Sequence, residues 1–183
     1  MKRLAYALAV TGLCVSATLT PATPASALET FEARMQASDA ASQARVDMLQ
    51  TFNRQPRPGQ YLWRDVPDGA GPERVVISIS DQLAYLYRGD TLMAVAATST
   101  GRDSKPSPTG IFSVLDKKPF YRSKKYDNAP MPWMQRIDQY GIAMHGGYNP
   151  GYPASHGCIR LPVAFAKKLY GVTGIGTPVY IGA

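Results

Sequence analysis

The stretch of sequence that decides the fold is Ser155-His156-Gly157-Cys158-Ile159-Arg160, which follows shortly after His145-Gly146. Together these segments hold both histidines of the chain and one of its two cysteines. A thiol is a useful nucleophile only as the thiolate, and a neighbouring imidazole can take its proton. The neighbours of Cys158 make a poor apolar core, so we expect a reactive thiol rather than a buried structural one.

The residues next to Cys158 also suggest how negative charge would be stabilised. Gly157 allows the backbone to approach a substrate closely, so the amides of Gly157 and Cys158 could point at a developing oxyanion. Pro162 suits the first turn of a helix, which we predict over 162–170 with Gly171 ending it. The N-terminus of that helix would favour a thiolate at Cys158.

Zinc binding is an alternative use of the same side chains. His145, His156 and Cys158 would supply three protein ligands, as catalytic zinc sites do. The His-x-Cys spacing lacks the usual paired-ligand signature, so we expect no metal at this site.

Residues 1–27 have the pattern of an export signal. Lys2 and Arg3 precede an apolar run over 4–19, and Ala25-Ser26-Ala27 matches a small-x-small cleavage site. The run is shorter than the roughly 20 residues of a membrane-spanning helix, and an uncleaved anchor is the alternative. Cleavage would remove Cys14 and leave one thiol in an exported protein of the periplasm or cell wall.

After the signal, we expect a helical arm with a linker over 28–72 and a strand-rich domain over 73–183. Residues 30–52 contain no Pro or Gly and predict one amphipathic helix. Its large apolar side chains are Phe31, Met35, Val46, Leu49 and Phe52.

Short apolar runs bounded by turn residues predict strands throughout the second part. Val75, Ile77 and Ile79 alternate with less apolar positions, as in a half-buried strand. Further strands are expected over 83–87, 91–98, 111–115, 140–145 and 176–181. Residues 116–139 are predicted to be irregular, and a loop of that length is usually functional or a lid.

The composition excludes several classes of protein. With 45% hydrophobic residues the chain can form a real core, and two cysteines cannot build a multi-bridge scaffold. The net charge of +7 favours an anionic neighbour without implying nucleic acid. We interpret the basic aromatic segment 121–126 as a solvated loop or a lid and expect no nucleic-acid partner.

These motifs resemble the L,D-transpeptidase (YkuD-like) catalytic domain family over residues 73–182. Three further segments support the resemblance: Pro108-Thr109-Gly110-Ile111-Phe112, Tyr140-Gly141-Ile142-Ala143-Met144-His145 and Gly176-Thr177-Pro178-Val179. The span from His145 to Cys158 is shorter than in many members, and Arg160 stands where many carry Asn. Both departures concern the substrate subclass.

The resemblance implies a mostly β fold, a mixed β-sandwich with a lid loop and short helices, preceded by the N-terminal helix. It implies that Cys158 is the nucleophile, that His145 is the general base and then the acid, and that the Gly146 carbonyl orients His145. The amides of His156, Gly157 and Cys158 would line the oxyanion site. Candidate substrate-binding residues are Arg160, Ser155, Trp133 and Tyr140. No cofactor is implied.

The implied substrate is a peptidoglycan stem peptide. Cys158 would attack the carbonyl before a terminal D-Ala, and an amine would then take the acyl group. A neighbouring stem would give a 3→3 cross-link, a lysine of a wall-anchored lipoprotein would give protein attachment, and water would give L,D-carboxypeptidase activity. The membrane would be a partner only through an uncleaved signal.

Three other readings remain open at this point. The first is a catalytically silent peptidoglycan-binding module. The second is an NlpC/P60-type endopeptidase, although those usually place the cysteine before the histidine in the chain. The third is a thiol redox sensor, which normally needs a resolving cysteine.

Overall fold

The computed structural model describes residues 28–183. The predicted export signal, residues 1–27, lies outside the described residues. Within 28–183 no helix combines the length and the apolar character needed to cross a bilayer.

Two β-sheets and two helices make up the described chain, which confirms the predicted mostly β, mixed sandwich. The larger sheet has the strand order β1-β4-β3-β2-β10-β5, and the smaller has the order β6-β7-β8-β9. Each sheet contains one parallel pair, β2 with β10 and β8 with β9. The bounds are α1 (Phe31–Phe52), β1 (Tyr61–Trp63), β2 (Glu73–Ser78), β3 (Leu83–Arg88), β4 (Thr91–Ala97), β5 (Gly110–Ser113), β6 (Asp116–Lys118), β7 (Met134–Arg136), β8 (Ala143–Gly146), β9 (Ile159–Leu161), α2 (Val163–Val172) and β10 (Pro178–Gly182).

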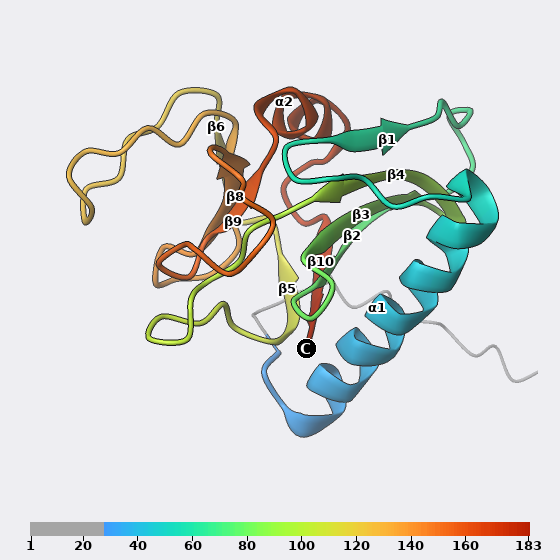
Figure 1. Cartoon of the computed structure of the whole chain (residues 1–183), viewed down its shortest axis with the longest axis horizontal. Coiled ribbons are helices and arrows are strands. Elements are labelled where there is room, and N and C mark those ends of the chain that lie inside the picture. The colour runs from blue at the N-terminus through green and yellow to red at the C-terminus, as the bar shows by residue number, and fades with distance from the viewer. Residues whose placement is uncertain (1–27) are drawn as a thin grey trace, which may run out of the picture.

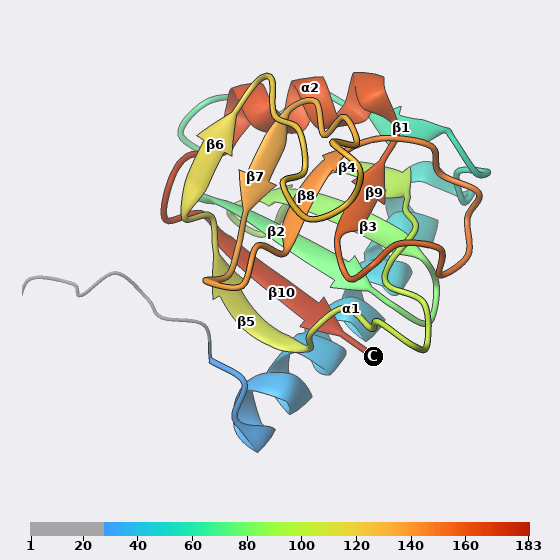
Figure 2. The same ribbon diagram turned by 90° about the vertical axis from the view of Figure 1, so that its left-hand side faces the viewer.

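The larger sheet lies between α1 on one face and the smaller sheet with α2 on the other (Figure 1). Figure 2 shows the smaller sheet from its outer side, with α2 along its upper edge. The main apolar core fills the space between the sheets and includes Ile77, Met144, Ile159 and Phe165. The smaller sheet therefore has one face on this core and one face available for a site.

Strand β2 is buried on both faces, so the prediction of a half-buried strand is wrong. Val75 and Ile77 face the core between the sheets, whereas Val76 packs in a second apolar cluster beneath α1. All three side chains are almost fully buried. The cause is α1, which covers the face that the alternating pattern would have left to solvent.

The predicted helix over 30–52 is present as α1, and defined caps close both ends. The Thr30 hydroxyl accepts a hydrogen bond from the Ala33 amide at 3.2 Å. At the other end Asn53 adopts a left-handed conformation, and its N–H donates to the Leu49 carbonyl at 3.0 Å. Both devices satisfy main-chain groups that a helix end leaves unpaired.

The buried side of α1 is small rather than bulky. It consists of Ala33, Ala37, Ala41, Ala44 and Met48. The large apolar side chains expected to define the packing face, among them Phe31 and Leu49, are mostly exposed. Small side chains let the helix approach the sheet closely: a Cβ added to Gly182 of β10 would lie 2.6 Å from the Ala37 carbonyl oxygen.

The remaining strands and α2 differ from expectation at several places. β1 lies in the segment expected to be a linker and pairs with β4 at the sheet edge. β6 and β7 occupy part of the stretch predicted to be irregular, and β9 was not expected. α2 continues through Gly171 to Val172, because Gly171 is tolerated inside a helix that packs on the core. Pairing and packing across the chain override these short local signals.

Candidate active site

The pairing of β8 with β9 brings the two sequence motifs together. These strands run parallel, with His145 opposite Arg160 and Met144 opposite Ile159. Met144 and Ile159 belong to the apolar core. Because side chains alternate along a strand, His145 and Arg160 project from the opposite, outer face. Cys158 comes two residues before Arg160 and falls on the same face.

A tight loop delivers Cys158 to the start of β9. Gly157 has a φ of 112°, and a Cβ at this position would lie 2.7 Å from Cδ1 of Ile142. The loop is tied internally, since the Gly157 amide donates to the Ser155 hydroxyl at 3.1 Å and that hydroxyl donates to the Cys158 carbonyl. The Ser107 hydroxyl also donates to the Gly157 carbonyl at 2.7 Å. These bonds fix the backbone on both sides of the thiol.

A cavity of about 430 Å³ lies over this outer face. Its floor includes Cys158, His145 and Arg160, and its other side comes from the loop between β6 and β7. That loop projects from the body of the molecule at the left of Figure 1. The loop's contribution to the lining is Tyr121, Ser123, Lys124, Lys125, Tyr126, Ala129, Pro130 and Met131. The predicted lid therefore forms one wall of the cavity.

His145 is held by the residue that follows it. Nδ1 lies 2.9 Å from the Gly146 carbonyl oxygen, and because a carbonyl only accepts, Nδ1 is the donor. This tautomer leaves Nε2 unprotonated and able to accept a proton. The side chain is 7% exposed, and burial lowers the pKa of His145 below 6.5, with Arg160 adding to the effect and the Gly146 hydrogen bond opposing it.

The Cys158 thiol is half-buried, and its sulfur lies 3.9 Å from the Gly141 carbonyl oxygen. Burial raises the pKa of Cys158 above 9.0, and Asp138 raises it further, whereas the Ala143 backbone hydrogen bond and Arg160 lower it. Both shifts favour the neutral thiol and the neutral imidazole over a thiolate with an imidazolium.

The lid contacts the Cys158 loop through an aromatic stack. The rings of Tyr126 and His156 are 4.4 Å apart between centroids, with planes inclined by 20°. Partial burial lowers the pKa of His156, and Arg102, Arg160 and Lys105 lower it further. A neutral, stacked imidazole suits a role in holding the loop and the lid together.

Most of the predicted substrate-binding residues do reach the cavity. Arg160, Ser155 and Tyr140 line it, with Tyr140 exposed at its rim. Ser155 is almost fully buried, and its hydroxyl is used within the loop. Its position fits loop structure better than direct contact with a ligand.

Trp133 does not line the cavity, so its expected place in the wall is wrong. Its φ is 58°, and its N–H donates to the Pro119 carbonyl at 2.9 Å. Its ring packs instead against Tyr170 of α2, with centroids 5.5 Å apart, and against Phe120 at 6.2 Å. The left-handed backbone at Trp133 accompanies this packing of the ring on α2.

Two expectations about charge stabilisation also need correction. The Gly157 amide already donates to Ser155, so it is not a free oxyanion donor in this structure. The N-terminus of α2 is not next to Cys158, because β9 intervenes between them. Val163 and Ala164 instead line a neighbouring hollow of about 650 Å³, which meets the site cavity only at Gly147.

Asp138 is a site feature that the sequence analysis did not single out. Asp138 is 5% exposed, and its Oδ1 accepts the amides of Tyr140, Gly141 and Ile142 at 2.9, 2.7 and 2.7 Å. It thereby shapes the turn that leads into β8. An Asp two residues before Tyr140-Gly141 was the available signal, since Asp commonly bonds to nearby main-chain amides in turns.

Among residues 28–183 no three His, Cys, Asp or Glu side chains gather in an arrangement suited to a metal ion. His156, which the zinc alternative required, faces Tyr126 of the lid.

Comparisons with known proteins agree with the fold and the motifs. Residues 72–181 match the family model described as YkuD, the L,D-transpeptidase catalytic domain. A Bacillus licheniformis protein named "Putative L,D-transpeptidase YkuD" is 29% identical over 118 residues, covering 60% of this chain and 66% of that protein.

Solved structures show the same fold at low sequence identity. An L,D-transpeptidase from Xylanimonas cellulosilytica has a TM-score of 0.57 at 24% identity and covers 65% of this chain and 64% of that one. L,D-transpeptidase 3 from Mycobacterium tuberculosis, in complex with a faropenem-derived adduct, has a TM-score of 0.56 at 22% identity and covers 61% of this chain and 60% of that one. The present chain thus spans somewhat less than two thirds of the proteins it matches.

Proposed function

The chain belongs to the YkuD family of L,D-transpeptidase catalytic domains, and from this we propose that it is a cysteine acyltransferase that acts on peptidoglycan stem peptides. The observation that carries the proposal is the shared cavity of Cys158 and His145. His145 is fixed there through Nδ1, which leaves Nε2 to serve as a base. A thiol and a base that line one cavity are the minimum for thioester chemistry.

In the proposed first step, Cys158 attacks the carbonyl that joins the third stem residue to the terminal D-Ala. Nε2 of His145 takes the thiol proton as the C–S bond forms. The C–N bond then breaks, and the departing amine of D-Ala takes that proton from the imidazolium. Because the pKa of the thiol is raised and that of the imidazole is lowered by burial, we expect proton transfer to accompany attack.

We assign the oxyanion contacts to the amides of His156 and Cys158, with Gly157 as the less suited donor because of its bond to Ser155. Arg160 would bind a carboxylate of the stem, for which a guanidinium offers two parallel hydrogen bonds. Tyr140 would contact the acyl-donor stem peptide at the rim of the cavity. Lys124 and Lys125 line the opposite wall and add positive charge for the same acidic substrate.

In the proposed second step, an amine attacks the thioester and gives a proton to Nε2 of His145 as the C–N bond forms. The C–S bond then breaks, and the imidazolium returns the proton so that Cys158 leaves as the thiol. The side-chain amine of a neighbouring stem would give a 3→3 cross-link, and a lysine of a wall-anchored lipoprotein would give protein attachment. Water as the acceptor would make the protein an L,D-carboxypeptidase. Such substrates lie outside the cytoplasmic membrane, so the proposal includes export through residues 1–27 to the periplasm or the cell wall.

The test is incubation of the purified protein with tetrapeptide-stem muropeptides, followed by mass spectrometry of the products and of the intact protein. We expect D-Ala release and a thioester on Cys158, and cross-linked dimers as the final product. The Cys158→Ala variant should show no D-Ala release, no thioester and no dimers. Trimmed monomers without dimers would instead indicate the carboxypeptidase, and binding without D-Ala release would indicate a silent module.

A second probe is a carbapenem, because structures of the same fold have been solved in complex with imipenem and with a faropenem-derived adduct. Acylation of Cys158 would add the mass of one inhibitor to the wild type and none to Cys158→Ala. Absence of any adduct on the folded wild type would contradict the proposed nucleophile.

A further inference from the structure

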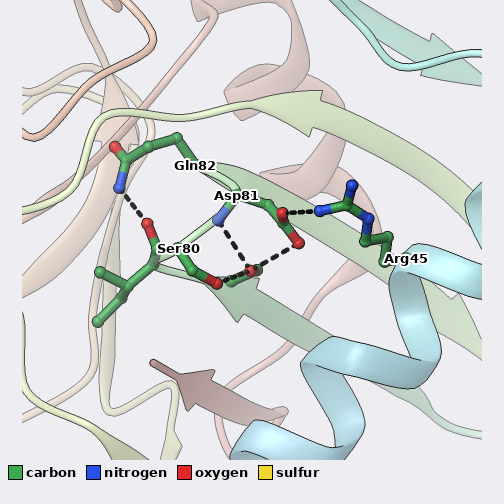
Figure 3. A network of polar contacts seen from close by, with 6 residues as sticks. Arg45, Ser80, Asp81 and Gln82 are labelled. Atoms are coloured by element: carbon green, nitrogen blue, oxygen red, sulfur yellow. Dashed lines mark hydrogen bonds and ion pairs between the residues drawn. The ribbon is translucent and has the colours of Figure 1, made fainter.

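The turn between β2 and β3 holds a dense network of polar contacts (Figure 3). Asp81 forms an ion pair with Arg45 of α1 and accepts a hydrogen bond from the Ser78 hydroxyl at 3.1 Å. The Asp81 amide donates back to the same hydroxyl at 3.2 Å. This outer part of the network joins the turn to α1, and its Arg45 side chain is largely exposed to solvent.

Gln82 extends the network in the other direction, into the protein. Its side chain is 7% exposed, and its φ of 53° is unusual for a residue with a side chain. Nε2 donates to the Ile79 carbonyl and to the Thr100 hydroxyl, both at 2.7 Å. Oε1 accepts the Thr100 amide at 3.0 Å. The carboxamide thus uses both donors and one acceptor position in fixed directions.

Thr100 connects Gln82 to the loop that carries Cys158. The Thr100 carbonyl accepts the amides of Ala154 and Ser155, both at 3.0 Å. The Ser155 hydroxyl in turn accepts the Gly157 amide and donates to the Cys158 carbonyl. A continuous series of hydrogen bonds therefore runs from the Gln82 carboxamide to the main chain of Cys158.

We propose that Gln82 is a positioning residue for Cys158, acting through Thr100 on the start of the Cys158 loop. A carboxamide suits this place because its nitrogen can donate to the Ile79 carbonyl while its oxygen accepts the Thr100 amide. An apolar side chain of similar size would leave the Ile79 carbonyl and the Thr100 amide without their partner, which is costly for buried groups. Misplacement of a reacting atom by about 1 Å can lower a rate by about a hundredfold.

The proposal assigns the effect to the inner part of the network only. Exposed ion pairs contribute little to stability, so the Arg45–Asp81 pair is not expected to hold the loop. Arg45→Gln is therefore the matched control: it alters the same network on the far side of the turn and should leave the Cys158 loop unchanged.

Two substitutions at position 82 separate the backbone from the side chain. Gln82→Gly removes the carboxamide, while glycine adopts the observed positive φ without strain. Gln82→Glu keeps the length and shape. When protonated, the carboxylic acid can still accept the Thr100 amide and donate one hydrogen bond. When ionised, it cannot donate and faces the Ile79 carbonyl unfavourably. The nearby charges of Asp81 and Arg45 are paired with each other.

The experiment measures two quantities on the purified protein: the rate of carbapenem acylation of Cys158, and hydrogen exchange of the amides of residues 154–158. For Gln82→Gly we expect acylation to fall between about tenfold and a hundredfold and exchange in 154–158 to rise, with Arg45→Gln matching the wild type. For Gln82→Glu we compare the acylation rate with that of the wild type at the same pH. We expect the two rates to be similar at acidic pH, and the rate of the variant to fall below that of the wild type as the carboxyl ionises. A purely structural residue would show no such pH-dependent rescue.

Wild-type exchange and acylation in Gln82→Gly, or a Gln82→Glu profile parallel to that of the wild type, would overturn the proposal. If Gln82→Gly fails to fold, the Gln82→Glu profile of the folded protein decides alone. The acylation readout rests on the proposed function, whereas the exchange readout does not. An unacylated wild type with faster exchange in Gln82→Gly would therefore count against the proposed function and for the positioning role.

Discussion

The ring of Tyr126 stacks on the ring of His156, with 4.4 Å between centroids and 20° between planes. This contact joins the lid directly to the loop that carries Cys158. Within the lid, the amides of Lys125 and Tyr126 both donate to the Ser123 hydroxyl, which holds the turn beneath the tyrosine. The stack is thus a defined contact between the lid and the Cys158 loop at the cavity.

Loss of this stack is expected to open the lid. Aromatic pairs are worth about 0.5–1.5 kcal/mol beyond the area they bury, which corresponds to roughly a two- to twelvefold change in the closed population. Tyr126→Ala should therefore be cut faster by trypsin after Lys124 and Lys125, by a factor in this range. Tyr126→Phe keeps the ring and should match the wild type. Equal cleavage of all three proteins would argue against the stack as the closing contact.

As the pH is lowered, the rate of Cys158 acylation is expected to drop with a midpoint below pH 6.5. His145 acts as a base only when neutral, so the rate drops as the pH falls through its pKa. Burial lowers that pKa below 6.5, which moves the drop to more acidic pH. The check is the acylation rate measured by intact mass as a function of pH. A drop centred above pH 6.5 would contradict a buried, neutral His145.

Alkylation of Cys158 by iodoacetamide should report the raised pKa of the thiol. Burial raises the pKa of Cys158 above 9.0, so the thiolate fraction at neutral pH is small. We expect slow alkylation near neutrality that accelerates as the pH rises past 9.0. Rapid alkylation at neutral pH would indicate a preformed thiolate instead.

Gly157→Ala is expected to disturb the loop for two separable reasons. The φ of 112° is strained for alanine, and the new Cβ would lie 2.7 Å from Ile142. Gly176→Ala is the matched control, because its φ of 88° carries the strain with no atom within 4 Å of the Cβ. Backbone strain of this kind costs about 1–3 kcal/mol. Thermal unfolding should show a greater loss of stability for Gly157→Ala than for Gly176→Ala. An equal loss of stability would mean that backbone strain alone explains the effect and that the contact with Ile142 adds nothing.

The packing of α1 predicts a contrast between two methionines of the same helix. Met48 is 1% exposed beneath the helix, whereas Met35 is 49% exposed on its outer side. Met48→Ala should lower the free energy of unfolding by about 2–5 kcal/mol, because it leaves a cavity in the cluster under α1. Met35→Ala should change it little. Denaturant unfolding of both variants tests whether α1 is part of the folded domain, and equal losses would contradict the observed packing.

The candidate site was largely predictable because its residues are close in the sequence. His145 lies within β8 and Cys158 directly precedes β9, which pairs with β8, so two short motifs of neighbouring sequence already pointed to one site. Trp133 failed as a pocket residue because its direction depends on a left-handed backbone and on packing against α2. No local pattern carries that information.

Fold class was predictable as well, whereas the packing of α1 was not. The large apolar residues of α1 suggested the wrong face, since close approach to β10 at Gly182 selected the alanines instead. The half-buried pattern of β2 failed for the same reason, because a helix from a distant part of the chain covers its second face.

The sequence by itself indicated the candidate chemistry: Cys158, a histidine that can serve as its base and a glycine that shapes the loop are properties of residue type and near spacing. Only the tertiary structure decided how they are held. The bonds of Gln82 to Thr100 and the stack of Tyr126 on His156 join segments far apart in the chain. The burial that raises the pKa of Cys158 and lowers that of His145 comes from the same packing. Such contacts depend on the register and layering of whole sheets, which short-range patterns do not specify.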